Sequence, residues 1–300
     1  MKINFESKEK GNAEGKKLEK APEKKKTQVD FVRHSKATYS TYKEMVNSDD
    51  PGKKFDHRNQ VFPDLSSGGI ELAKEQARLF FEKFDPEKEQ LFFVSSNEAR
   101  ALETAGIYRE EALAEKFTIL KPEHSRSSIS EDHLDGDVRM IDTLSLNLPN
   151  VIVSSLLNPK SSRHEVNYDA LDPKEAEMYK KLQEEIDKDN KGSFAENFIA
   201  YGDLVKKYVP SFETAEDLYN RNFKNMIRLF KFAEKKTGES SSKKQIRILA
   251  FGHENQLLVA LNKYFGEHGI NNCEVLSAES GADGEIKGNF RGKEIQDLTK

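Results

Sequence analysis

The stretch VDFVRHSKATYS, residues 29–40, begins as an apolar run and ends in two adjacent chargeable side chains, Arg33 and His34. A short apolar run bounded by polar residues predicts a buried strand, here over residues 27–32. Arg33 and His34 would then stand at the carboxyl end of that strand. Their role depends on which other side chains the fold brings to the same place.

Strand-like and helix-like segments alternate along the chain after this stretch. Further strands are predicted over residues 90–96, 116–120 and 245–252, with a closing hairpin from 273–279 and 284–290. Helices are predicted over residues 66–84, 97–116, 174–189, 214–236 and 255–266. Ser66 or Ser67 and Ser96 are plausible N-caps, and Thr214 with Asp217 resembles a capping box. This alternation predicts a three-layer α/β/α fold around a mostly parallel central sheet.

Two more chargeable side chains follow predicted strands. Arg100 lies in the first turn of the helix after the second strand, and His253 follows the strand 245–252. The carboxyl ends of parallel strands meet at one edge of a sheet, so both are expected beside Arg33 and His34. Arginine binds phosphate oxygens with fixed paired donors, and a neutral histidine can attack phosphorus. The sequence therefore predicts a pocket for a phosphoryl group at this edge.

Five short motifs occur in an order that resembles the histidine phosphatase superfamily, which is also called phosphoglycerate mutase-like. The superfamily's R-H-G motif reads RHS at 33–35, and its S-S-x-x-x-R-A-x-Q-T-A motif reads SSNEARALETA at 95–105. The other three motifs read LSSGG at 65–69, FETAEDLYNR at 212–221 and GHE at 252–254. The resemblance covers residues 28–292 and implies a phosphoglycerate mutase-like fold.

The resemblance also implies a role for each matching residue. His34 would be the phosphorylated nucleophile, and Arg33, Arg100 and His253 would complete the phosphate pocket. Residues next to these motifs, together with one that follows the third strand, are expected to contact the substrate: Ser35, Lys36, Thr38, Glu254 and Arg126.

The superfamily needs a carboxylic acid that protonates the leaving oxygen and then activates water. In one branch this acid follows the third strand, where the segment 128–136 makes Glu131 the preferred candidate. In another branch it directly follows the second histidine, which would make it Glu254. Asp132 and Asp135 are weaker candidates. The sequence leaves this assignment open.

Departures from the motifs bear on the reaction. Ser35 stands where the superfamily usually has glycine, and Lys36 stands where mutases carry glutamate. The run RHSKAT is similar to the R-H-A-K-S variants of phosphohistidine phosphatases. Mutases often have tryptophan near these motifs, and this chain has none. The sequence therefore favours a phosphatase over a mutase.

Length and composition indicate how the chain is organised. Residues 1–27 are nearly all Lys, Glu, Gly, Asn, Ala, Ser and Pro, and are expected to form a disordered charged tail. Residues 28–300 would form the phosphatase domain. The spacing from His34 to His253 is long for a minimal member of the superfamily, so an insertion at about 140–210 is expected to form a cap.

Composition also restricts the class of protein. The net charge of −4, from 48 basic and 52 acidic residues, gives no support for nucleic-acid binding. No stretch approaches the roughly 20 apolar residues that span a membrane, and no secretory signal is recognisable. One cysteine, Cys273, excludes an intrachain disulfide and fits a cytoplasmic protein. No P-loop or metal-binding motif is present, so neither a cofactor nor a metal is expected.

These observations predict a metal-independent phosphatase that hydrolyses a phosphorylated small molecule or phosphoprotein through a phosphohistidine on His34. One alternative is a phosphoglycerate-type mutase, which would return the phosphoryl group to its product and depend on a bisphosphorylated primer. The other is a binding module of low turnover that holds phosphate without forming phosphohistidine.

Overall fold

The computed structural model describes residues 27–37, 65–96, 98–120, 138–140, 151–154, 166–188, 194–239, 244–281, 285–295 and 297–298. The predicted tail lies outside the described residues apart from its last residue, Thr27. The predicted insertion is described in part.

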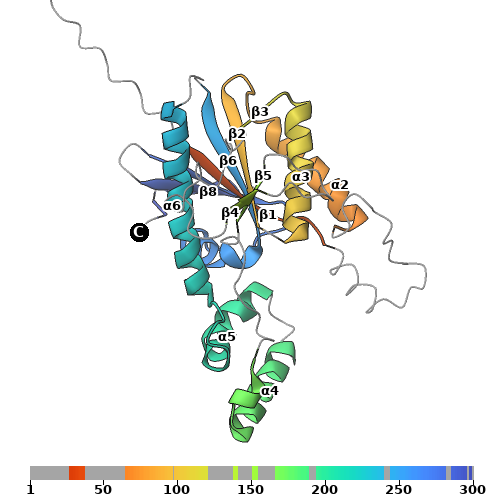
Figure 1. The fold of residues 1–300 in the computed structure, drawn as a ribbon, viewed down its shortest axis with the longest axis vertical. Helices are drawn as coiled ribbons and strands as arrows, with labels where there is room; N and C mark the ends of the chain where they lie inside the picture. The colour runs from red at the N-terminus through yellow and green to blue at the C-terminus, as the bar shows by residue number, and fades with distance from the viewer. Residues whose placement is uncertain are drawn as a thin grey trace, which may run out of the picture.

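Nine strands in the described part of the chain form one sheet, in the order β4-β5-β2-β6-β1-β7-β8-β9 with β3 paired to β2 (Figure 1). The strands are β1 (Gln28–Arg33), β2 (Glu89–Ser95), β3 (Thr118–Ile119), β4 (Val138–Met140), β5 (Val151–Ser154), β6 (Gln245–Gly252), β7 (Val275–Ser280), β8 (Ile286–Phe290) and β9 (Lys293–Ile295). The four central strands β5, β2, β6 and β1 are parallel, while β4 and β7–β9 pair antiparallel. The parallel centre and the β7–β8 hairpin confirm the predictions.

Helices cover both faces of this sheet, which confirms the three-layer prediction. The α-helices of the described residues are α2 (Ser67–Phe81), α3 (Ala99–Ala114), α4 (Pro173–Lys188), α5 (Phe194–Tyr208), α6 (Ala215–Glu239) and α7 (Leu258–Ala260). Helices α2 and α3 pack on one face, and α6 packs on the other (Figure 1). Alternate side chains of β2 serve the two layers, because Phe93 packs with α2 and α3 while Phe92 packs with α6.

The start of α2 follows the predicted capping chemistry. Ser66 is the N-cap, and its side chain accepts a hydrogen bond from the Gly69 N–H at 3.1 Å. A β-bridge between Ala37 and Leu65 brings the chain just before this helix beside the chain that follows β1. The backbones come so close that a Cβ on Gly69 would lie 2.2 Å from the Lys36 carbonyl oxygen. Glycine at 69 is therefore a steric requirement of the fold.

The predicted capping of α3 by Ser96 is wrong. The helix begins at Ala99 with Glu98 as its N-cap, and no side chain caps it. Ser96 lies two residues before this N-cap and is fully buried, and its hydroxyl accepts the Glu98 N–H at 3.2 Å while also bonding to His253. The serine hydroxyl thus orders the turn between β2 and α3 rather than the helix itself.

The predicted single helix over 255–266 is also wrong in detail. This stretch folds as a 3₁₀ turn η3 (Glu254–Gln256), the short α7 and a π turn η4 (Leu261–Phe265). Side chains compete with the helical ladder here: the Gln256 side chain accepts the His253 N–H at 3.3 Å, and Asn222 donates to the Gln256 carbonyl at 2.8 Å. This irregular stretch therefore holds the backbone of the preceding residue, His253, through the Gln256 side chain.

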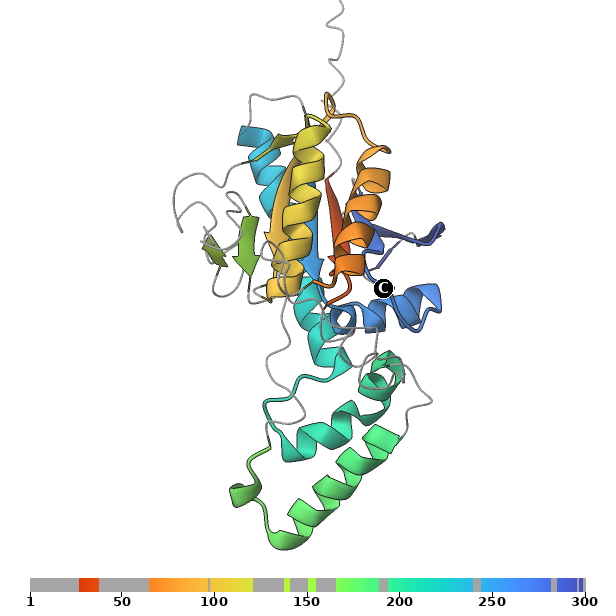
Figure 2. The same ribbon diagram turned by 90° about the vertical axis from the view of Figure 1, so that its right-hand side faces the viewer.

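Helices α4 and α5 fall within the predicted insertion. They pack against each other through their own small core, in which the ring centroids of Tyr179 and Tyr208 lie 4.8 Å apart. The two helices lie beyond the carboxyl ends of the central strands (Figures 1 and 2), and α5 contacts η3. This places them on the side of the sheet where the predicted site lies.

Candidate active site

The register of β1, β2 and β6 brings their carboxyl ends side by side. Arg33 pairs with Gly252, and the His34 N–H donates to the Gly252 carbonyl at 2.9 Å. On the other side of β6, the Ser96 N–H donates to the Phe251 carbonyl at 2.9 Å. The turns that follow these three strands therefore share one edge of the sheet, as predicted.

His34 is held in a defined tautomer. Its Nδ1 lies 2.7 Å from the Ser35 carbonyl, which only accepts hydrogen bonds, so the neutral ring carries its hydrogen on Nδ1. Nε2 is then unprotonated, and it accepts a hydrogen bond from Arg100 Nε at 3.3 Å. Burial, followed by the charges of Arg100 and Arg33, lowers the pKa of His34 to about 4 against the opposing effect of the Ser35 bond. His34 is thus neutral near pH 7 with its lone pair on Nε2.

The second imidazole lies directly beside the first. The ring centroids of His34 and His253 are 5.1 Å apart at an interplanar angle of 65°, and His253 Nε2 lies 3.0 Å from the Ser96 hydroxyl. Burial, together with nearby His34, Arg100 and Arg33, lowers the pKa of His253 to about 2. His253 is therefore also neutral near pH 7, and it adds no positive charge that would repel the two guanidinium groups.

Arg33 is fixed from one side only. Its Nη2 forms an ion pair with Glu254 Oε2 at 3.1 Å, and its Nη1 donates to the Ile270 carbonyl. Its Nε is buried and has no hydrogen-bond partner among the described residues. Leaving a buried donor unsatisfied costs about 1–3 kcal/mol. Arg33 therefore carries one buried donor that the described residues leave unused.

Arg100 is oriented in a similar way by a carboxylate. Its Nη1 lies 3.0 Å from Glu98 Oε2, while its Nε points to His34. The Arg100 side chain is 23% exposed, so it is mostly buried within the site. Glu98 and Glu254 therefore balance the two arginines without separating them from the imidazoles.

Ser35, which is predicted to contact the substrate, bonds within the fold in this structure. It is fully buried, its hydroxyl donates to the Gly69 carbonyl at 2.6 Å, and its N–H donates to the Thr104 hydroxyl at 3.0 Å. Both of its donors are therefore used to fasten α2 and α3 to the turn after β1. Lys36, the next residue, is exposed.

Several predicted site residues lie outside the described residues. These are Thr38, Arg126 and Glu131, together with the weaker acid candidates Asp132 and Asp135. The preferred general acid therefore remains a prediction from the sequence. Glu254, the alternative, lies beside Arg33, and its Oε1 accepts the Ile270 N–H at 3.4 Å.

The residues of the motif at 212–221 bond to one another at the start of α6, and α6 in turn holds the turn that follows His253. Arg221 and Glu213 form a two-point ion pair, with Nε–Oε1 at 2.8 Å and Nη2–Oε2 at 2.7 Å. Thr214 and Asp217 exchange hydrogen bonds as the predicted capping box at the start of α6. The next residue along α6 after Arg221 is Asn222, which holds η3 as described above.

The structure adds three residues that the sequence did not single out for the site. Glu98 orients Arg100, Thr104 accepts the Ser35 N–H, and Asn272 Nδ2 donates to the His34 carbonyl at 2.8 Å. Glu98 and Thr104 lie inside the SSNEARALETA segment, so the motif pointed to their neighbourhood. Asn272 lies in a loop before β7, and no pattern in the sequence marks it.

The described residues contain no group of three or more His, Cys, Asp or Glu side chains arranged to hold a metal ion.

Arg33 and Glu254 line an open cavity of about 450 Å³ together with the 267–271 loop and Arg291. In the described ranges, none of the helices is both long and apolar enough to cross a membrane.

Comparison with known proteins gives similarity in structure but none in sequence. No protein-family model and no curated protein matches the chain. A phosphoglycerate mutase from Bacillus anthracis str. Sterne has a TM-score of 0.49 at 15% identity, covering 92% of this chain and 95% of that one. A mycobacterial glucosyl-3-phosphoglycerate phosphatase has a TM-score of 0.44 at 14% identity, covering 89% and 97%. The ecdysone phosphate phosphatase from Bombix mori, solved with tungstate, has 0.38 at 13%, covering 87% and 91%. With these TM-scores below 0.5, the reaction is judged from the side chains.

Proposed function

We propose that this chain is a phosphatase of the histidine phosphatase superfamily, which hydrolyses a phosphomonoester or phosphoprotein through a phosphohistidine on His34. The observation that carries the proposal is the state of His34. Its Nδ1 is tied to the Ser35 carbonyl and its Nε2 is unprotonated beside Arg100. A buried imidazole with its lone pair among arginines is suited to attack phosphorus.

The first step transfers the phosphoryl group to the protein. The lone pair of His34 Nε2 forms a bond to phosphorus while the bond from phosphorus to the leaving oxygen breaks. A protonated carboxylic acid gives its proton to that oxygen, which departs as an alcohol. Arg33 and Arg100 donate hydrogen bonds to the equatorial oxygens, where negative charge is spread in the transition state.

The second step returns His34 to its neutral form. The same carboxylate, now ionised, takes a proton from a water molecule whose oxygen attacks phosphorus. The phosphorus–nitrogen bond breaks, and its electron pair returns to Nε2. Glu131 is the preferred acid and base because both oxygens of Glu254 already accept hydrogen bonds, one from Arg33 and one from the Ile270 N–H.

Rapid-quench trapping tests the nucleophile. The protein is mixed with ³²P-labelled 4-nitrophenyl phosphate, and the wild type is compared with His34→Ala and with Arg78→Ala, which changes an exposed residue of α2 away from the site as control. We expect an acid-labile, base-stable phosphoprotein that is absent from His34→Ala and unchanged in Arg78→Ala. Absence of adduct and turnover in a wild type that still binds phosphate would overturn the proposal in favour of a binding module.

A further inference from the structure

The loop of residues 267–274 lies against Arg33 of the candidate site. Three of its backbone groups bond to Arg33: the Ile270 carbonyl accepts its Nη1, the Glu274 carbonyl accepts its N–H at 3.2 Å, and the Cys273 N–H donates to its carbonyl at 3.0 Å. Asn272, in the same loop, holds the His34 carbonyl. The position of both site residues therefore depends on the position of this loop.

The loop has no regular secondary structure of its own. It runs from Gly266, which ends η4 in the left-handed conformation with φ of 67°, to the start of β7. Cys273 also adopts a positive φ, 61°, which costs energy for a residue with a side chain. A loop of this kind needs contacts from outside to keep one conformation.

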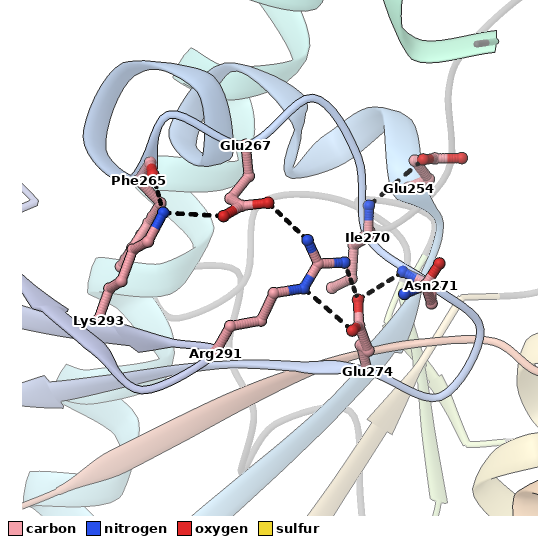
Figure 3. A network of polar contacts seen from close by, with 8 residues as sticks. All are labelled: Glu254, Phe265, Glu267, Ile270, Asn271, Glu274, Arg291 and Lys293. Atoms are coloured by element: carbon pink, nitrogen blue, oxygen red, sulfur yellow. Dashed lines mark hydrogen bonds and ion pairs between the residues drawn. The ribbon is translucent and has the colours of Figure 1, made fainter.

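Arg291 supplies those contacts from the hairpin between β8 and β9 (Figure 3). Its Nε and Nη2 bond to the two carboxylate oxygens of Glu274 at 3.1 and 2.7 Å, and its Nη1 bonds to Glu267 Oε2 at 2.5 Å. One guanidinium thus joins both ends of the loop. We call Arg291 with its two partners, Glu267 and Glu274, the clamp. Glu274 also accepts the Asn271 N–H at 2.6 Å, so the clamp extends into the middle of the loop.

Arg291 lies in a two-residue turn that closes the β8–β9 hairpin. Phe290 pairs with Lys293, and the two residues between them, Arg291 and Gly292, have φ of 49° and 76°. Two positive φ values in a two-residue turn match the twist of the flanking strands. Lys293 adds a second bond to Glu267, at 2.9 Å, and bonds to the Phe265 carbonyl at 3.0 Å. The clamp is therefore anchored to the sheet.

We propose that Arg291 is a positioning residue, which holds the 267–274 loop so that the loop aims Arg33 at the phosphoryl group bound beside His34. Arg291 acts through the loop, and it is not placed on the substrate. The inference rests on the proposed function for its kinetic consequence. Its structural part, the ordering of the loop, stands without that function.

The kinetic test compares Arg291→Gln and Arg291→Lys with the wild type on 4-nitrophenyl phosphate. Gln removes the charge that joins two carboxylates, so we expect KM to rise and kcat/KM to fall about tenfold through misplacement of Arg33. Lys can reach one carboxylate at a time and should restore part of the loss. Arg78→Ala, which removes an exposed arginine of α2 in an i,i+4 pair, should leave both constants unchanged.

The double variant separates positioning from general stability. If Arg291 acts through Arg33, then adding Arg291→Gln to Arg33→Ala should cause no further loss of kcat/KM. A full additional loss in the double variant, or unchanged constants in Arg291→Gln alone, would overturn the proposal while the phosphatase function stands.

Hydrogen exchange gives a readout that needs no turnover. Arg291→Gln should speed exchange of the Cys273 and Arg33 amides, while amides inside the β2–β6 pair stay protected. If the wild type proves inactive, the proposed function fails, and this exchange pattern with a weaker affinity for inorganic phosphate still supports the clamp. Unchanged exchange at both amides would overturn it in either case.

Discussion

At the residue scale, the candidate site places a neutral histidine beside two positively charged arginines. A phosphate pocket needs positive charge, whereas a nucleophilic imidazole must stay neutral. Burial and, to a smaller extent, the adjacent guanidinium groups of Arg100 and Arg33 lower the pKa of His34, so under the proposed function the charges that bind phosphate also help to keep the imidazole unprotonated. Glu254 and Glu98 orient the two arginines, and the proposed mechanism then needs one more residue, the general acid.

Leaving-group dependence identifies that acid. Glu131→Gln removes the proposed proton donor, so we expect a rate loss of about 10²–10⁴-fold on a phenyl phosphate, whose leaving oxygen needs a proton. The loss should be much smaller on 4-nitrophenyl phosphate, whose leaving group departs as a stable anion. Glu254→Gln should instead raise KM on both substrates, because it releases Arg33. The assay is kcat and KM across a series of aryl phosphates.

The opposite pattern is equally readable. If Glu254→Gln shows the steep dependence on the leaving group and Glu131→Gln does not, then Glu254 is the acid and the assignment to Glu131 is wrong.

At the element scale, α2 and the turn after β1 approach each other so closely at Gly69 that there is no room for a Cβ. Gly69→Ala would place a methyl group 2.2 Å from the Lys36 carbonyl oxygen, so helix or turn must shift. We expect a loss of about 1–3 kcal/mol in the free energy of unfolding, as for overpacked cores. A fall in kcat/KM should accompany this loss, because the Gly69 carbonyl accepts a hydrogen bond from Ser35, the residue that follows His34.

A matched glycine one residue earlier serves as the control. A Cβ on Gly68 meets nothing within 4 Å, so Gly68→Ala should be neutral or slightly stabilising within the helix. Urea unfolding and steady-state kinetics measure both variants. Equal behaviour of the two alanine variants would show that the α2 contact is loose in solution.

The elements themselves were largely readable from the sequence. The strands at 28–33, 89–95 and 245–252 and the helices α2 and α6 follow apolar periodicity, and Ser66 and Thr214 cap as predicted. The failures at Ser96 and at 254–265 share a cause. In both places, side chains that serve His253 replace the local capping or helical pattern, and periodicity carries no signal for such tertiary demands.

At the scale of the whole molecule, the candidate site combines residues far apart in the chain. The predicted parallel sheet accounts for some of these residues and not for others. Arg33, His34, Arg100 and His253 come together because each lies at or shortly after the carboxyl end of a central strand. Asn272 and Arg291 could not be predicted, since they belong to a loop and a hairpin turn whose positions depend on the complete fold. The sequence shows that these residues are polar, but it does not show what they hold.

Both imidazoles also couple the stability of the whole molecule to pH. The folded protein has pKa values of about 4 for His34 and about 2 for His253, against about 6.5 for histidine in an unfolded chain. Unfolding therefore takes up protons below pH 6.5. The two histidines leave the free energy of unfolding unchanged above that pH, and they lower it as the pH drops from 6.5 toward 4. Each imidazole should contribute a slope of about 1.4 kcal/mol per pH unit in this window.

Urea unfolding between pH 7.5 and 4.5, in buffer free of phosphate, measures this slope. His253→Gln removes one of the two imidazoles and should lower the slope by about 1.4 kcal/mol per pH unit relative to the wild type. Asp30, whose pKa is raised mainly by burial, works in the opposite direction at acid pH, but it is common to both proteins and cancels in the comparison. Identical slopes would mean that His253 takes up its proton at the same pH in the folded and the unfolded protein, so that folding does not lower its pKa.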